Sequence, residues 1–87
     1  MKEVEFIDLI MSCIKALKAA KGINLEIRNT DRASENGYKV LFINLDTDKY
    51  FEATFYWPAV ERINTDEEKI QNGKLIIKKL YQNAGLS

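Results

Sequence analysis

The chain has 87 residues, with 13 Lys and Arg against 13 Asp and Glu and no His, so its formal charge at neutral pH is zero. Apolar residues make up 46% of it, with only 4 Gly and 1 Pro; this composition is globular and excludes collagen-like and disordered chains. A chain of this length has room for one modest core, so we expect a single domain over residues 1–87.

The absence of histidine and the presence of a single cysteine exclude imidazole-based catalysis and the usual zinc sites. Histidine is the commonest acid-base group near neutral pH and the commonest metal ligand, and one Cys without His cannot supply the usual zinc ligand sets. Cys13 cannot form an internal disulfide, and no window approaches the roughly 18 apolar residues of a membrane span. We therefore expect a cytoplasmic protein that is no enzyme, binds no metal or cofactor and enters no membrane.

The stretch from Lys2 to Lys21 predicts the first helix. Its apolar residues recur every three or four positions, the period of a helix that buries one stripe. They are Phe6, Ile7, Ile10, Cys13, Ile14, Leu17 and Ala20. Acids in the first turns and lysines in the last suit the helix dipole, and Gly22 suits its end. Because Cys13 lies on the stripe, we predict a buried side chain and no nucleophile.

Three strands are predicted next, because the apolar period changes to two. They cover residues 23–28, Tyr38–Leu45 and Tyr50–Trp57. A polar run over 29–37 separates the first two, a short polar link at 46–49 separates the second and third, and Pro58 ends the last. Short links between consecutive strands favour an antiparallel meander.

The segment Pro58–Asn64 fits a helical turn or a short edge strand, and both remain open. Thr65-Asp66-Glu67-Glu68 then has the spacing of a capping box, which predicts the start of a second long helix. The expected apolar stripe of that helix is Ile70, Ile77, Leu80, Tyr81 and Ala84. Asn72-Gly73 predicts either a break in it or a close approach to a neighbour.

These elements predict an α+β fold of two layers, a three-stranded antiparallel sheet packed against an N-terminal and a C-terminal helix in the order αβββ(α)α. The order resembles that of double-stranded RNA-binding domains over most of the chain. In that family a Lys-rich start of the second helix holds phosphates. Here Asp66, Glu67 and Glu68 would repel them, and Lys78-Lys79 lie too late in the helix. An RNA-binding module is therefore the alternative, and nucleic acid is not the expected partner.

Both faces of the predicted sheet are apolar. If Leu41, Ile43 and Leu45 face the helices, the opposite face is also rich in aromatic and apolar side chains. On the third strand, the residues expected to face the helices are Phe51, Ala53, Phe55 and Trp57. This outer face is the predicted binding surface, with Tyr38, Val40, Phe42, Tyr50, Thr54 and Tyr56 as its residues. Tyrosine-rich apolar faces are typical of protein interfaces. Two alternatives remain open: residues 58–64 fold over this face, or scattered exposed tyrosines are simply tolerated.

From these features we expect a non-enzymatic protein that acts by binding another protein. By analogy of size and class with phage anti-defence and bacterial immunity proteins, the expected role is inhibition of a nuclease or a defence complex. Acidic contacts to the partner are predicted at Asp46, Asp48, Asp66, Glu67 and Glu68. The outer face would also serve to pair two copies into a homodimer through the sheet.

Overall fold

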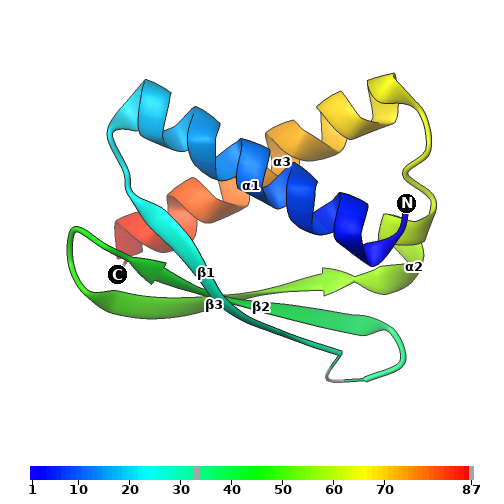
Figure 1. Cartoon of the computed structure of the whole chain (residues 1–87), viewed down its shortest axis with the longest axis horizontal. Coiled ribbons are helices and arrows are strands. Elements are labelled where there is room, and N and C mark those ends of the chain that lie inside the picture. Colours follow the sequence, from blue (N-terminus) through cyan, green and yellow to red (C-terminus); the bar gives the residue numbers. More distant parts are fainter. Residues whose placement is uncertain (33, 87) are drawn as a thin grey trace.

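The computed structural model describes residues 1–32 and 34–86 and confirms the predicted α+β order (Figure 1). Its elements are α1 (Glu3–Lys21), β1 (Leu25–Asp31), β2 (Gly37–Asn44), β3 (Lys49–Tyr56), α2 (Trp57–Glu61) and α3 (Asp66–Leu86). The strands form one antiparallel sheet in the order β1-β2-β3, and α1 and α3 lie on the same side of it. The polar connection predicted over 29–37 is shorter, because β1 continues to Asp31; it includes residue 33, which lies outside the described residues.

Helix α1 buries one stripe and ends at a glycine. Its buried residues are Phe6, Ile10, Cys13 and Leu17, all of which belong to the predicted stripe, whereas Ala20 is exposed. Gly22 follows with a φ of 67°, and its amide donates to the Lys18 carbonyl at 3.0 Å. Side chains with a Cβ rarely adopt this left-handed conformation, so the glycine ends the helix where the sequence predicted.

The face of β2 that packs against the helices is the one that was predicted to point away from them. Its register pairs Tyr38 with Phe55, Val40 with Ala53 and Phe42 with Phe51, and directly opposed residues share a face. Tyr38, Val40 and Phe42 are each 0% exposed, so their prediction as outer-face residues is wrong. Because Leu41 and Ile43 are as apolar as these three, the alternation in β2 did not decide which set faces the core.

Aromatic rings from three elements meet over this part of the sheet. Phe6 of α1 lies 6.0 Å from Tyr38 and 5.1 Å from Phe55, measured between ring centroids. The Trp57 ring lies 5.1 Å from that of Tyr38. The Tyr38 hydroxyl donates to the Glu3 carboxylate at 2.8 Å, so this buried side chain keeps a polar partner at the start of α1.

The segment left open over residues 58–64 begins as the short helix α2. Trp57 and Val60 of α2 belong to the main core, and Ile63 just after it is buried. Since the core lies between the sheet and the helices, α2 packs on the helix side. The alternative in which this segment folds over the outer face of the sheet is wrong.

The capping box at the start of α3 is formed as predicted. The Glu68 amide donates to the Thr65 hydroxyl oxygen at 3.1 Å, and the Thr65 amide donates to the Glu68 carboxylate at 3.1 Å. The carboxylate also accepts from the Thr65 hydroxyl at 2.9 Å, and the two hydrogen bonds that it accepts from Thr65 hold the pKa of the Glu68 carboxyl below its usual value.

Helix α3 continues through Gly73 without a break, and the glycine marks a close approach to α1. The Cys13 thiol donates to the Gly73 carbonyl at 3.5 Å. The predicted apolar stripe of α3 is partly wrong, because Ile70 is 60% and Tyr81 45% exposed, whereas Ile76 is buried. Contact with α1 on one flank and the sheet on another rotates the buried arc of α3 away from Ile70.

Candidate functional site

The outer face of the sheet carries three of the six predicted binding residues. Tyr50, Thr54 and Tyr56 of β3 are exposed there, the two tyrosines by 58% and 60%. They alternate along one strand, and six residues of strand separate the tyrosines by about 20 Å. Glu52 lies between them, and Glu26 pairs with Arg28 on β1 at 3.1 Å. Leu41 and Ile43 of β2 lie opposite Glu52 and Tyr50, so the outer face presents two separate tyrosines beside apolar as well as polar side chains.

The predicted acidic contacts do not form one cluster. Asp46 and Asp48 lie in the turn between β2 and β3, and residues 66–68 begin α3 at the other end of the molecule (Figure 1). The Asp46 carboxylate accepts hydrogen bonds from the backbone and side-chain amides of Asn24 at 3.2 and 2.9 Å. Asp48 has a φ of 60°, a conformation that Asp tolerates in turns. Asp46 thus holds the turn to the start of β1.

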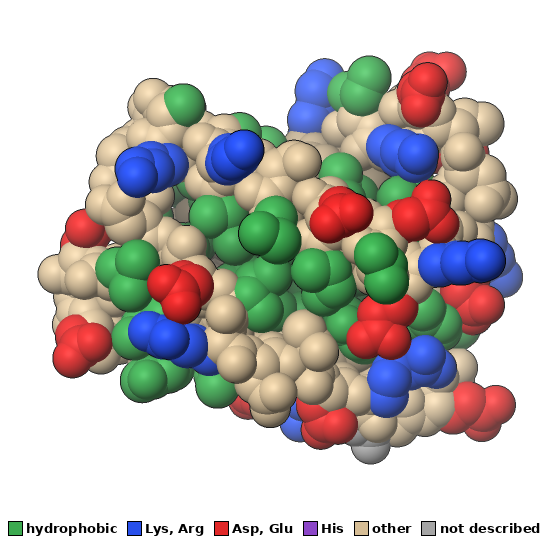
Figure 2. Space-filling view, in the orientation of Figure 1, with side chains coloured by type: hydrophobic (Ala, Val, Ile, Leu, Met, Phe, Trp, Pro, Cys, Tyr) green, Lys and Arg blue, Asp and Glu red, His purple; other side chains and the backbone are tan. Residues whose placement is uncertain are grey.

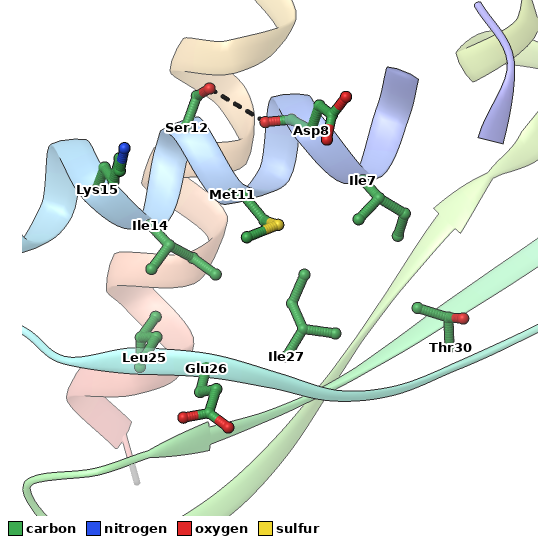
Figure 3. Close-up of a pocket in the computed structure, with 10 residues that line it drawn as sticks. All are labelled: Ile7, Asp8, Met11, Ser12, Ile14, Lys15, Leu25, Glu26, Ile27 and Thr30. Atoms are coloured by element: carbon green, nitrogen blue, oxygen red, sulfur yellow. Dashed lines mark hydrogen bonds between the residues drawn. The ribbon is translucent and has the colours of Figure 1, made fainter. Parts of the chain in front are cut away.

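A concave surface lies between α1 and β1, and we call it the α1–β1 groove. It has a volume of about 760 Å³. Its apolar lining consists of Ile7, Met11 and Ile14 from α1 and Leu25 and Ile27 from β1, with Thr30 beside them. Figure 2 shows hydrophobic side chains gathered in the middle of this face. Figure 3 shows Ile7, Met11 and Ile14 pointing towards β1, whereas Asp8, Ser12 and Lys15 lie on the upper side of α1. Pockets of this volume take peptide segments or small molecules.

An irregularity in β1 helps to line the groove. The pairing of β1 with β2 shifts between Ile27 and Asn29, which leaves Arg28 as an extra residue. Because of this bulge, Leu25, Ile27 and Thr30 all face the helices, although Thr30 is out of step with strict alternation. The groove stays open because α3 covers the β3 side of the sheet and α1 alone lies over β1 (Figure 1).

The groove adjoins an unpaired strand edge. β1 is an outer strand of the sheet. The Asn24 carbonyl accepts from the Leu45 amide of the next strand at 2.8 Å. Since backbone groups alternate in direction along a strand, those of Leu25 and Ile27 point to the free edge. The two residues that line the groove thus also offer unpaired backbone donors and acceptors beside it.

Sequence reasoning missed this groove, although a signal for it was present. Ile7, Met11 and Ile14 follow one another at spacings of four and three, which places them on one flank of α1 beside the buried stripe. Met11 is 54% exposed. An apolar arc wider than one stripe indicates a helix that has more to cover than its own core.

The structure gives no support for a nucleophilic Cys13 or, among the described residues, for a metal site. Burial raises the pKa of the Cys13 thiol from 9.0 to about 11, so the thiolate that a nucleophile needs is disfavoured. Among residues 1–32 and 34–86, no three His, Cys, Asp or Glu side chains come together in a way that could hold a metal ion. Within the same residues, no helix combines the length and apolar character needed to cross a membrane.

Comparison with known proteins adds no relative. No protein-family model matches the chain, and neither a curated protein nor a solved structure shows significant similarity to it.

Proposed function

We propose that this chain is a non-catalytic protein that acts by binding another protein, and that the α1–β1 groove receives an extended apolar segment of that partner. The observation that carries the proposal is an open apolar groove beside an unpaired strand edge. Burial of apolar area supplies affinity, and backbone hydrogen bonds to the edge supply orientation.

The shape of the groove favours an extended segment. A strand added next to β1 would pair with the free backbone groups of Leu25 and Ile27. Its alternate side chains would then point up under α1, towards Met11 and Ile14, while the others faced solvent. The expected partner segment therefore alternates apolar and polar residues.

A small chain that occupies a partner's surface suits the role of an inhibitor. A cytoplasmic nuclease or defence complex is the partner class that size and composition favour, as an analogy of class. Tyr50, Thr54 and Tyr56 are proposed as a secondary contact on the outer face, and pairing of two copies through that face stays a prediction.

Affinity capture from nuclease-treated lysate of the source cells, read by quantitative mass spectrometry, tests the proposal. Met11→Glu places a charge in the groove, Tyr50→Ala/Tyr56→Ala strips the outer face, and Tyr81→Ala is the matched control on exposed α3. We expect one protein to be retained by the wild type and by Tyr81→Ala but depleted at least tenfold by Met11→Glu, since burying an unpaired charge costs several kcal/mol.

Two results would contradict this proposal. Loss of the protein with the tyrosine double variant alone would move the interface to the outer face of the sheet. Retention of nucleic acid only, from lysate without nuclease and with a steep loss between low and moderate salt, would favour the RNA-binding alternative.

A further inference from the structure

We propose that the outer face of the helical layer, meaning the surface of α1 and α3 that points away from the sheet, packs against the same face of a second copy of this chain. The copy is turned end for end, so that the acidic end of each layer lies over the lysine-rich end of the other. This face adjoins the α1–β1 groove, whose rim includes Asp8 and Lys15, and the inference goes beyond the proposed function.

Charge is segregated along the helical layer. Every acid of α1 precedes Leu9, every acid of α3 precedes Lys69, and the remaining charged residues of both helices are lysines. The acids are Glu3, Glu5, Asp8, Asp66, Glu67 and Glu68; the lysines are Lys15, Lys18, Lys21, Lys69, Lys74, Lys78 and Lys79. Glu3 and Lys79 bind the Tyr38 hydroxyl and the Thr54 carbonyl of the sheet, so these two do not belong to the outer face. Since α1 and α3 both start at the same side of the molecule (Figure 1), the two charge patterns reinforce each other.

An apolar strip crosses the middle of this face. A shallow hollow of about 330 Å³ follows the seam between α1 and α3, where Leu9, Ile70 and Ile77 line it beside Gly73. Ile70 is 60% exposed at its margin. Apolar side chains ringed by charges of both signs are typical of a helix face that packs against another protein.

The charges of each helix are spaced for a two-fold axis. Asp8 and Lys15 are exposed and seven residues apart, about two turns, so they share a face of α1 with a midpoint between residues 11 and 12. Glu67 and Lys78 are exposed and eleven residues apart, about three turns, with a midpoint between residues 72 and 73 of α3. Each helix therefore carries an acid and a base that exchange places when it is reversed.

The two midpoints lie at one level of the layer. A Cβ on Gly73 would be 3.7 Å from Leu9 Cδ1 and 3.9 Å from Cys13 Sγ, so residue 73 of α3 sits beside residues 9–13 of α1. One two-fold axis at this level, lying in the interface and across the helices, brings Asp8 over Lys15 of the copy and Glu67 over Lys78 of the copy. The apolar strip then meets itself at the axis.

Charge also selects the orientation of the copy. An axis along the helices would set acids over acids and lysines over lysines, which is repulsive. Within the described part of the chain, Asp8, Lys15, Glu67 and Lys78 form no ion pair with another side chain. Their charges are thus available to the second copy.

Sedimentation velocity over a concentration series up to about 200 µM, in roughly 50 mM salt, tests the pairing. We expect the wild type to reach twice its chain mass of 10.0 kDa. Asp8→Lys and Lys15→Asp should each raise the dissociation constant about tenfold or more, because symmetry turns each reversal into two like-charge contacts. The double variant Asp8→Lys/Lys15→Asp should return close to the wild-type value.

Glu52→Lys makes the same charge change on the outer face of the sheet and should leave the dimer intact. Glu67→Lys and Lys78→Glu repeat the swap on α3, in case an α1 variant is shown by circular dichroism not to fold. A monomeric wild type at the highest concentration, unaffected dimers in the single variants, or a double variant weaker than both singles would each overturn the proposal. Self-association is measured on the isolated chain and partner capture on lysate, so the failure of this proposal and the failure of the groove proposal are distinguishable.

Discussion

At the scale of single residues, Cys13 should make the stability of the fold depend on pH. Its folded pKa of about 11 lies above the 9.0 of an exposed thiol because the side chain is buried. A folded pKa that is raised means that stability is fully present below pH 9 and is lost as pH rises towards 11. Two pKa units correspond to roughly 2–3 kcal/mol.

We therefore expect the free energy of unfolding in urea to fall by about 2 kcal/mol or more between pH 8 and pH 11. Cys13→Ala should show a clearly smaller fall, measured against its own value at pH 8. Burial also raises the pKa of Tyr38, and this contribution is common to both proteins. An equal fall in the two proteins would show that Cys13 is not the group responsible.

The hydroxyl of Tyr38 makes a polar contact that can be tested apart from the packing of its ring. Its hydroxyl donates to Glu3 at 2.8 Å, and no alternation pattern indicates that pair. We expect Tyr38→Phe to lower the free energy of unfolding by about 1 kcal/mol. A double-mutant cycle with Glu3→Ala should show that this loss is shared, and additive losses would argue against a coupled pair.

At the scale of elements, two glycines of the helical layer should respond oppositely to alanine. Gly22 has a φ of 67°, which alanine adopts only with strain. Gly73 lies inside α3, and a Cβ there would make ordinary contacts of 3.7 and 3.9 Å with α1. Helix formation favours alanine over glycine by about 1 kcal/mol, so the two substitutions have opposite signs.

We expect Gly22→Ala to destabilise the protein by about 1–2 kcal/mol and Gly73→Ala to stabilise it by about 0.5–1 kcal/mol, as measured by thermal and urea unfolding. Gly73→Leu is the control for space, because its longer side chain would push α1 and α3 apart. A loss of stability in Gly73→Ala comparable with that in Gly73→Leu would mean that the crossing tolerates no added atom.

At the scale of the whole molecule, three surfaces point in different directions. The sheet presents separate tyrosines on its outer face, the helical layer presents a charge-segregated face, and the open side between them holds the α1–β1 groove. The openness arises from an imbalance of cover: α2 and α3 pack at the β3 side, whereas α1 alone lies over β1. Two layers joined along one side leave an apolar opening on the other.

The charge at the start of α3 argues against binding of double-stranded RNA. Asp66, Glu67 and Glu68 lie in the first turn of α3, the place where double-stranded RNA-binding domains carry lysines. We expect no saturable binding of a duplex of about 16 base pairs in fluorescence anisotropy, even at low salt. Replacing all three acids by lysine is the informative comparison, and salt-sensitive binding by the wild type would contradict the expectation.

The sequence by itself determined the two long helices, the three strands and the layer order, but not the short helix α2. Local signals were sufficient for this: the stripe of α1, the stop at Gly22, the capping box at Thr65 and the change of period after residue 22. Each depends on neighbours within one or two turns, so chain-local physics decides it. The buried Cys13 follows from the same periodicity.

Only the tertiary structure decided which face of β2 is inside. Tyr38, Val40 and Phe42 compete with an equally apolar set, and the choice depends on the register with β3 and on rings contributed by α1. The α1–β1 groove and the level at which Gly73 meets α1 depend likewise on how distant elements pack. These properties belong to pairs of elements far apart in the chain, and periodicity within one element does not encode them.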